Sequence, residues 1–169
     1  MKDIITGGIM EKARFENRIP QNNIFARDIY RAFVEELQSM TTYVQGAMTL
    51  APYLPAVTKL FDEIARVEIS HYEQLGQLLL HLGVAPALNT RLRQEPIRLG
   101  IDATIEASHL ARQMMHEKIN EEEKSAKEYH RLSTNAPTRS IANMLLAIAQ
   151  EEEEHALALR GMLSRFENS

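Results

Sequence analysis

The 169-residue sequence contains no cysteine. The chain therefore cannot form a disulfide, a zinc–thiolate site, an iron–sulfur centre or a thiol nucleophile of its own. Long apolar runs are also missing. No stretch approaches the roughly 18 uninterrupted apolar residues of a membrane span, and Asp3 and Glu11 interrupt the N-terminal segment too early for a secretory signal. From these absences we expect a cytoplasmic protein that does not enter a membrane.

Glycine and proline are scarce, with seven and six residues, and long tracts contain neither. This composition is typical of an all-helical protein, and the length fits one domain with a sizeable core. The formal net charge of −4 and the lack of any run rich in lysine or arginine argue against nucleic acid as a partner.

Apolar residues recur with helical spacing in four segments, which predicts four long helices. The segments cover residues 24–50, 56–82, 101–134 and 138–166. In the first segment the predicted buried stripe comprises Phe33, Leu37, Met40, Val44 and Ala47. We expect residues 1–23 to form an N-terminal arm and residues 24–169 to form the helical domain.

The breaks between the segments predict how the helices are connected. The prolines within residues 51–55 and the Asn135–Pro137 stretch leave room only for short connections, whereas residues 84–100 form a long one. Short connections make antiparallel hairpins, and a long connection can cross the length of a bundle. The sequence therefore predicts an all-α four-helix bundle of two hairpins joined by a long crossover.

The two predicted hairpins repeat the same polar residues at the same spacing. The first helix of each carries a glutamate, a serine three residues later and a tyrosine seven residues later. The second helix carries Ile-Ala-x-x-Glu-x-x-His. The matching residues are Glu36, Ser39 and Tyr43 with Glu122, Ser125 and Tyr129, and Ile64, Ala65, Glu68 and His71 with Ile148, Ala149, Glu152 and His155.

The repeated acidic and imidazole groups lie on the apolar faces of the predicted helices. Glu68 and His71, three residues apart, differ by about 60° around the helix and share one face. Glu152 and His155 repeat this pair, and the glutamates of the first helices lie between apolar residues of their own stripes. Six ionisable groups are therefore expected to point into the bundle.

Four buried carboxylates require counter-charge, because desolvating each costs several kcal/mol. The predicted core face offers no lysine or arginine at that level. Two divalent cations balance four carboxylates, and neutral imidazoles add no charge. Oxygen and nitrogen ligands without sulfur suit two iron ions or two manganese ions, with zinc left open.

These motifs resemble the ferritin-like di-metal carboxylate proteins, and specifically the rubrerythrin branch. That family combines Glu and Tyr seven residues apart on two helices with Glu-x-x-His on the other two. The resemblance covers residues 24–166 and implies a ferritin-like four-helix bundle. It further implies that Glu68 and Glu152 bridge two metal ions, while Glu36 with His71 and Glu122 with His155 are terminal ligands. Tyr43 and Tyr129 would act beside the carboxylates, donating a hydrogen bond or a proton.

The sequence departs from rubrerythrins in two respects. They usually carry a rubredoxin domain with four cysteines, so electrons must here come from a separate donor protein. They also tend to have one more glutamate on the third helix, at the position of Ser125. The remaining ligand set, four Glu and two His, is shared with bacterioferritin-like and manganese-catalase-like sites.

The resemblance implies a non-haem di-iron or di-manganese oxidoreductase that acts on hydrogen peroxide or O₂. Peroxide reduction, peroxide disproportionation and ferroxidation share such a site. The alternatives are a ferritin-like iron-storage subunit with a ferroxidase site, and a structural bundle with a metal-free polar core. A homodimer is the default expectation for a long-helix bundle.

Several single residues have a plainer interpretation. Glu151 could replace Glu152 as a ligand, although the repeat favours Glu152, and Glu35 is expected to be exposed. The two tyrosines could be ordinary core aromatics. The remaining histidines have no partner in the repeat and are interpreted as surface or partly buried residues. They are His81, His109, His116 and His130.

Overall fold

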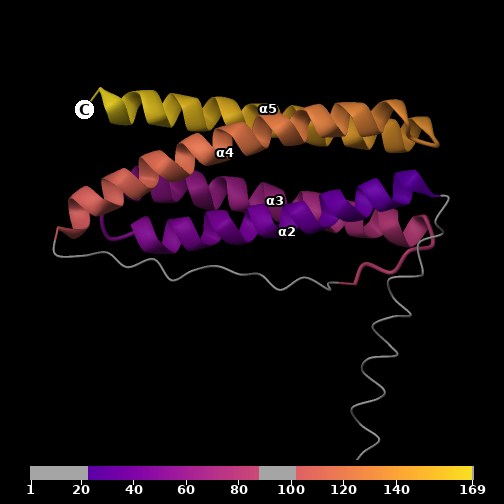
Figure 1. Ribbon diagram of the computed structural model, residues 1–169, viewed down its shortest axis with the longest axis horizontal. Helices are drawn as coiled ribbons and strands as arrows, with labels where there is room; N and C mark the ends of the chain where they lie inside the picture. The colour runs from indigo at the N-terminus through magenta and orange to yellow at the C-terminus, as the bar shows by residue number, and fades with distance from the viewer. Residues whose placement is uncertain (1–22, 88–101, 169) are drawn as a thin grey trace, which may run out of the picture.

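The computed structural model describes residues 23–87 and 102–168 and consists there of four long α-helices (Figure 1). They are α2 (Ile24–Leu50), α3 (Pro55–His81), α4 (Ala103–Thr134) and α5 (Arg139–Glu167). Each predicted helix bound lies within two residues of the observed one. The predicted arm up to residue 22 and the connection from residue 88 lie outside the described residues. None of the four helices combines the length and apolar character that a membrane span requires.

The helix ends lie where the local chemistry of the sequence stops or starts a helix. Asn23 caps α2 by accepting a 3.0 Å hydrogen bond from the backbone N–H of Ala26, and Pro55 occupies the first turn of α3, where no N–H partner is needed. Gly83 follows α3 with a φ of +77°, the left-handed conformation that glycine adopts without strain. Thr138 caps α5 through the N–H of Ile141.

The helices form two antiparallel hairpins, α2 with α3 and α4 with α5, which lie as two layers in Figure 1. The hairpins meet through α2 against α4 and α3 against α5. Gly76 of α3 faces Phe33 near the start of α2, whereas Gly46 near the end of α2 faces Met114 in the first half of α4. Consequently α3 ends at one end of the bundle and α4 begins at the other, as a long crossover requires.

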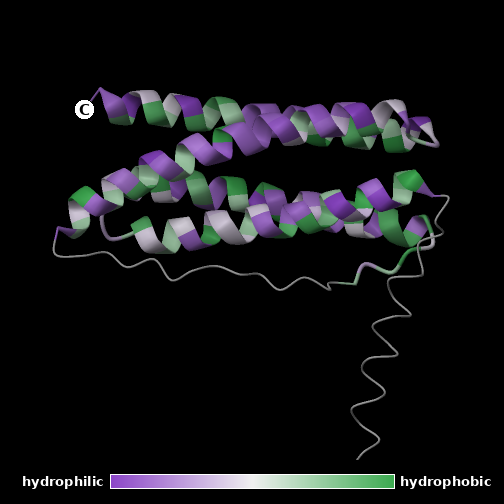
Figure 2. Ribbon diagram, viewed as in Figure 1, coloured by the Kyte–Doolittle hydropathy of each residue, from purple (hydrophilic) through white to green (hydrophobic). Residues whose placement is uncertain are grey.

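The apolar core is divided into two clusters, one toward each end of the bundle. The Phe33 cluster includes Phe33, Leu75, Leu79, Leu132 and Leu145, and the Phe61 cluster includes Leu50, Phe61, Ala111, Met115 and Leu159. Hydrophilic residues dominate the middle of α4 and α5 in Figure 2, and a buried polar layer lies between the two clusters.

The stripe predicted for the first helix is partly wrong. Val44 is 38% exposed, and Leu37 is only half-buried. Their neighbours in sequence, Tyr43 and Glu36, occupy the buried face instead. The helix is therefore rotated so that polar groups, rather than two aliphatic side chains, point inward at this level.

Candidate metal centre

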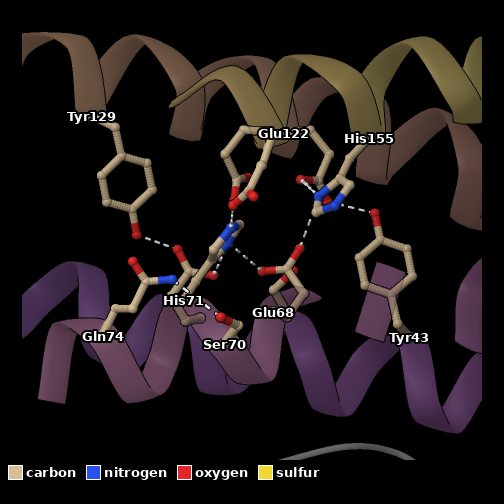
Figure 3. Close-up of polar contacts among 12 residues, drawn as sticks. Tyr43, Glu68, Ser70, His71, Gln74, Glu122, Tyr129 and His155 are labelled. Atoms are coloured by element: carbon tan, nitrogen blue, oxygen red, sulfur yellow. Dashed lines mark hydrogen bonds and ion pairs between the residues drawn. The ribbon is translucent and has the colours of Figure 1, made fainter. Parts of the chain in front are cut away.

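Six ionisable side chains, one or two from each helix, converge between the two apolar clusters (Figure 3). None of the six residues is more than 6% exposed. This central layer consists of Glu36, Glu68, His71, Glu122, Glu152 and His155. The structure thus brings together all six residues that the repeat singled out.

The central layer provides two overlapping groups of possible ligand atoms. In each group the atoms lie within 4.8 Å of one another. One group is Glu36, Glu68, His71 and Glu152, and the other is Glu68, Glu122, Glu152 and His155. Glu68 and Glu152 belong to both groups, so their carboxylates lie between the two halves.

The imidazoles face the carboxylates through their Nδ1 atoms. The Nδ1 atom of His71 lies 2.9 Å from Glu152 Oε1 and 3.6 Å from Glu68 Oε2. The Nδ1 atom of His155 lies 3.3 Å from Glu122 Oε2 and 3.4 Å from Glu68 Oε1. One nitrogen of each ring is thereby directed at the same small volume as the carboxylate oxygens.

Four buried atoms at the centre make no hydrogen bond of acceptable geometry. They are both carboxylate oxygens of Glu68, Nδ1 of His71 and Oε1 of Glu152. Buried polar atoms normally have a partner, because leaving one unpaired costs about 1–3 kcal/mol. Oxygen and imidazole nitrogen atoms left in this way fit a hard or borderline cation such as iron or manganese. The arrangement is compatible with a pair of metal ions.

Two buried tyrosines approach Glu36 and Glu122 from opposite ends of the bundle. The hydroxyl of Tyr43 in α2 donates a 2.5 Å hydrogen bond to Glu122 Oε1 in α4, and the hydroxyl of Tyr129 in α4 donates to Glu36 Oε1 in α2. The two bonds cross between the hairpins. Burial and the neighbouring glutamates raise the pKa of both phenols, so each keeps its proton.

Protons balance the charges of the central layer in the metal-free chain. Burial raises the pKa of Glu36 to about 8 and also raises that of Glu152. Burial would lower the pKa of His155, but its contacts with the carboxylates of Glu122 and Glu68 prevail and raise it to about 9. Two neutral carboxyl groups and two imidazolium–carboxylate pairs therefore suit a layer without metal.

Hydrogen bonds and contacts between opposite charges also outweigh the effect of burial on the pKa values of the other members of the layer. Burial opposes both the protonation of His71 and the ionisation of Glu68. Contact with Glu152, and then with Glu36 and Glu68, nevertheless raises the pKa of His71. Contact with Glu36, and then with His155 and His71, lowers the pKa of Glu68. The pKa of Glu122 is likewise lowered, chiefly through His155 against the effect of burial.

Lys118 is a buried cation that the sequence interpretation missed. It is 2% exposed, and its Nζ lies 3.5 Å from Glu122 Oε1. It donates to Ser39 Oγ at 2.7 Å and to Glu121 at 2.9 Å. Burial would lower the pKa of Lys118, but attraction to Glu122 and Glu121 raises it, so the ammonium stays charged. The expectation that no lysine lies at this level is wrong.

Glu151 is an exposed residue, with 48% of its side chain accessible, but it also contacts the central layer. Its Oε2 lies 2.7 Å from Nε2 of His71, across the bundle from its own helix. A carboxylate behind an imidazole fixes the ring orientation and makes the other nitrogen a better donor to a metal. A contact between α3 and α5 of this kind has no signal in the spacing of the sequence.

The other histidines do not join the central layer. His81, His109, His116 and His130 are all exposed. His130 pairs with Glu153 at 3.1 Å and His116 with Glu167 at 3.9 Å on the surface. Glu35 is exposed as well. These plainer interpretations are confirmed.

A cleft of about 830 Å³ between α2 and α4 reaches the central layer. Its lining includes Glu36, Glu122 and Glu152, while charged residues of both signs form the outer walls. The histidines come from α3 and α5 on the other side of the layer. A small polar molecule could therefore approach the carboxylates from the side that lacks imidazoles.

Fold and site together define a four-helix bundle with a buried carboxylate–histidine layer. A family model described as a ferritin-like domain matches residues 28–169. The chain belongs to the ferritin-like family. No curated protein and no solved structure matches it. The closer resemblance to rubrerythrins stays a prediction.

Proposed function

We propose that the protein binds two iron or two manganese ions in the central layer and is a non-haem oxidoreductase acting on hydrogen peroxide or O₂. The observation that carries the proposal is the convergence of six buried ligand-type side chains, with four central atoms left without hydrogen-bond partners. Glu68 and Glu152 are the proposed bridging ligands. Glu36 with His71, and Glu122 with His155, are the proposed terminal ligands.

Charge supports two ions rather than one. Two divalent cations match the four carboxylates of the layer. Around it, Lys118 is paired with Glu121, and Glu151 is half exposed to water. In this proposal the cations take the place of the protons that the metal-free layer holds. Because the layer offers mainly carboxylate ligands and no thiolate, it favours iron or manganese over softer metal ions that prefer sulfur ligands.

The surrounding residues suit a reaction with a small oxidant. When bound, a reduced metal pair would supply the two electrons that split the O–O bond of hydrogen peroxide into two water molecules, with uptake of two protons. Tyr43 and Tyr129 hold protonated hydroxyls against the terminal glutamates. The cleft between α2 and α4 reaches the carboxylates, and the two apolar clusters flank the central layer on both sides. In this proposal a separate donor protein restores the electrons.

Metal content tests the binding part of the proposal. After anaerobic reconstitution with Fe(II) or Mn(II), elemental analysis should find about two ions per chain. Glu68→Gln with Glu152→Gln should lose both ions, because the shared carboxylates disappear without a change in shape. The matched control is Glu73→Gln with Glu154→Gln, two exposed glutamates on the same two helices. Equal metal content in both variants would contradict the site assignment.

Turnover tests the reaction. Loss of hydrogen peroxide at the expense of a reductant, without release of O₂, indicates a peroxidase. Release of one O₂ for every two hydrogen peroxide molecules indicates disproportionation. Uptake of O₂ with accumulation of Fe(III) inside a large cage indicates the storage alternative. A metal-loaded protein that consumes neither hydrogen peroxide nor O₂ would contradict the oxidoreductase proposal.

A further inference from the structure

The two halves of the central layer differ at two positions that the repeat makes equivalent. Lys118 precedes Glu122 by four residues, whereas Ala32 stands four residues before Glu36. Glu151 directly precedes Glu152, whereas Val67 directly precedes Glu68. One half thus gains a cation and the other gains an anion.

Lys118 holds its charge firmly beside the Glu122–His155 half. Its ammonium donates to Ser39 and Glu121, lies 3.5 Å from Glu122 Oε1 and stands 4.5 Å from the centre of the Tyr43 ring. With its side chain 3% exposed, water screens this charge little. At the equivalent place in the other half, the buried methyl group of Ala32 carries no charge.

Glu151 acts on the Glu36–His71 half. Its carboxylate contacts Nε2 of His71 at 2.7 Å, which leaves Nδ1 facing Glu36, Glu68 and Glu152. Val67 cannot make the corresponding contact to His155, because it has no polar side-chain atom. Both differences between the halves therefore favour a cation in the Glu36–His71 half over one in the Glu122–His155 half.

We infer that the two halves bind metal unequally, the Glu36–His71 half first and tightly, the Glu122–His155 half second and weakly, and that Lys118 is the positioning residue that sets the difference. The inference rests on the proposed metal binding and deepens it. A fixed ammonium competes with an incoming cation for Glu122 and repels it, whereas Glu151 adds negative charge behind His71 and strengthens its donor atom.

Titration of the metal-free protein with Mn(II) at pH 8 tests the inference, with free Mn(II) followed by electron paramagnetic resonance. The wild-type protein should show two classes of site whose dissociation constants differ by about tenfold or more. Lys118→Met should tighten the weak class by about tenfold and leave the tight class unchanged. The matched control is Lys124→Met, an exposed lysine on the same helix, which should change neither class. A gain in affinity is a result that damage to the fold would not produce.

Three further variants show which half of the central layer holds the tight class of site and which holds the weak class. Glu36→Gln should remove the tight class, and Glu122→Gln should remove the weak class. Glu151→Gln should weaken the tight class by about 10- to 100-fold, and it tests the inference independently if Lys118→Met does not fold.

The outcomes separate this inference from the proposed function. If the wild-type protein binds neither Mn(II) nor Fe(II), the proposed function fails and the inference fails with it. If two ions bind with equal affinity, or if Lys118→Met leaves the weak class as it was, only the inference is overturned.

Discussion

The two ends of the bundle and its middle are built from the same four helices, but they bury different side chains. The Phe33 and Phe61 clusters bury aliphatic and aromatic groups, whose removal from water favours folding directly. The central layer buries four carboxyl groups and two imidazoles, whose removal from water opposes folding. The ends therefore stabilise the bundle, whereas the middle lowers its stability unless its charges are balanced.

The largest expected effect comes from opening a cavity in an end cluster. Leu159 is fully buried in the Phe61 cluster, so Leu159→Ala should lower the free energy of unfolding by about 2–5 kcal/mol. Leu157→Ala, two residues earlier on the same helix, should change it by less than about 0.5 kcal/mol, because Leu157 is 65% exposed. Urea denaturation of the metal-free proteins measures both. Similar losses in the two variants would remove the contrast between the cluster and the surface.

An intermediate effect is expected from pH, and it concerns the central layer alone. The pKa of Glu36 rises from 4.5 to about 8 on folding, and that of His155 rises from 6.5 to about 9. The folded chain therefore keeps a proton on Glu36 between pH 4.5 and about 8, and one on His155 between pH 6.5 and about 9, that the unfolded chain has lost. Because the folded chain holds more protons in these intervals, the free energy of unfolding decreases as pH rises. The metal-free protein should lose on the order of 1–3 kcal/mol between pH 6.5 and 9.

Denaturation in the presence of a chelator, repeated across this pH range, measures the effect. The metal-loaded protein is the control and should show the opposite slope, because metal ions bind deprotonated ligands. A metal-free protein whose stability is constant or increases toward pH 9 would contradict the assigned charge states.

The helical pattern of the sequence was enough to predict the four helices and the membership of the central layer. Helical periodicity, together with the Pro, Gly and Asn residues that start or end helices, determines the helix bounds. The internal repeat singles out the six residues without any spatial information. The same periodicity misassigned Val44, because apolar character favours it over Tyr43 when only one helix is considered.

Lys118 and Glu151 show where such reasoning ends. Lys118 shares the inward face with Glu122 at a spacing of four residues, so the signal was present, but the charged composition of the surrounding segment hid it. Glu151 contacts His71 across 80 positions of sequence. Such a contact depends on how α3 and α5 are packed, which spacing within one helix cannot reveal.

The smallest expected effect comes from replacing a group that is already neutral. At pH 6.5 Glu36 is protonated in the metal-free chain, and its Oε1 accepts a hydrogen bond from Tyr129, as the carbonyl of a glutamine would. Glu36→Gln should therefore change the free energy of unfolding by less than about 0.5 kcal/mol near pH 4, where the unfolded carboxyl is neutral as well. It should stabilise the metal-free protein by about 1–3 kcal/mol at pH 9, because the unfolded carboxyl is ionised there and the folded one must ionise in a buried site. Glu68→Gln is the contrast, because Glu68 is ionised beside His71 and His155 and its loss should destabilise the protein at both pH values. If the two substitutions behave alike in urea denaturation, the division of the central layer into neutral and charged carboxyl groups is wrong.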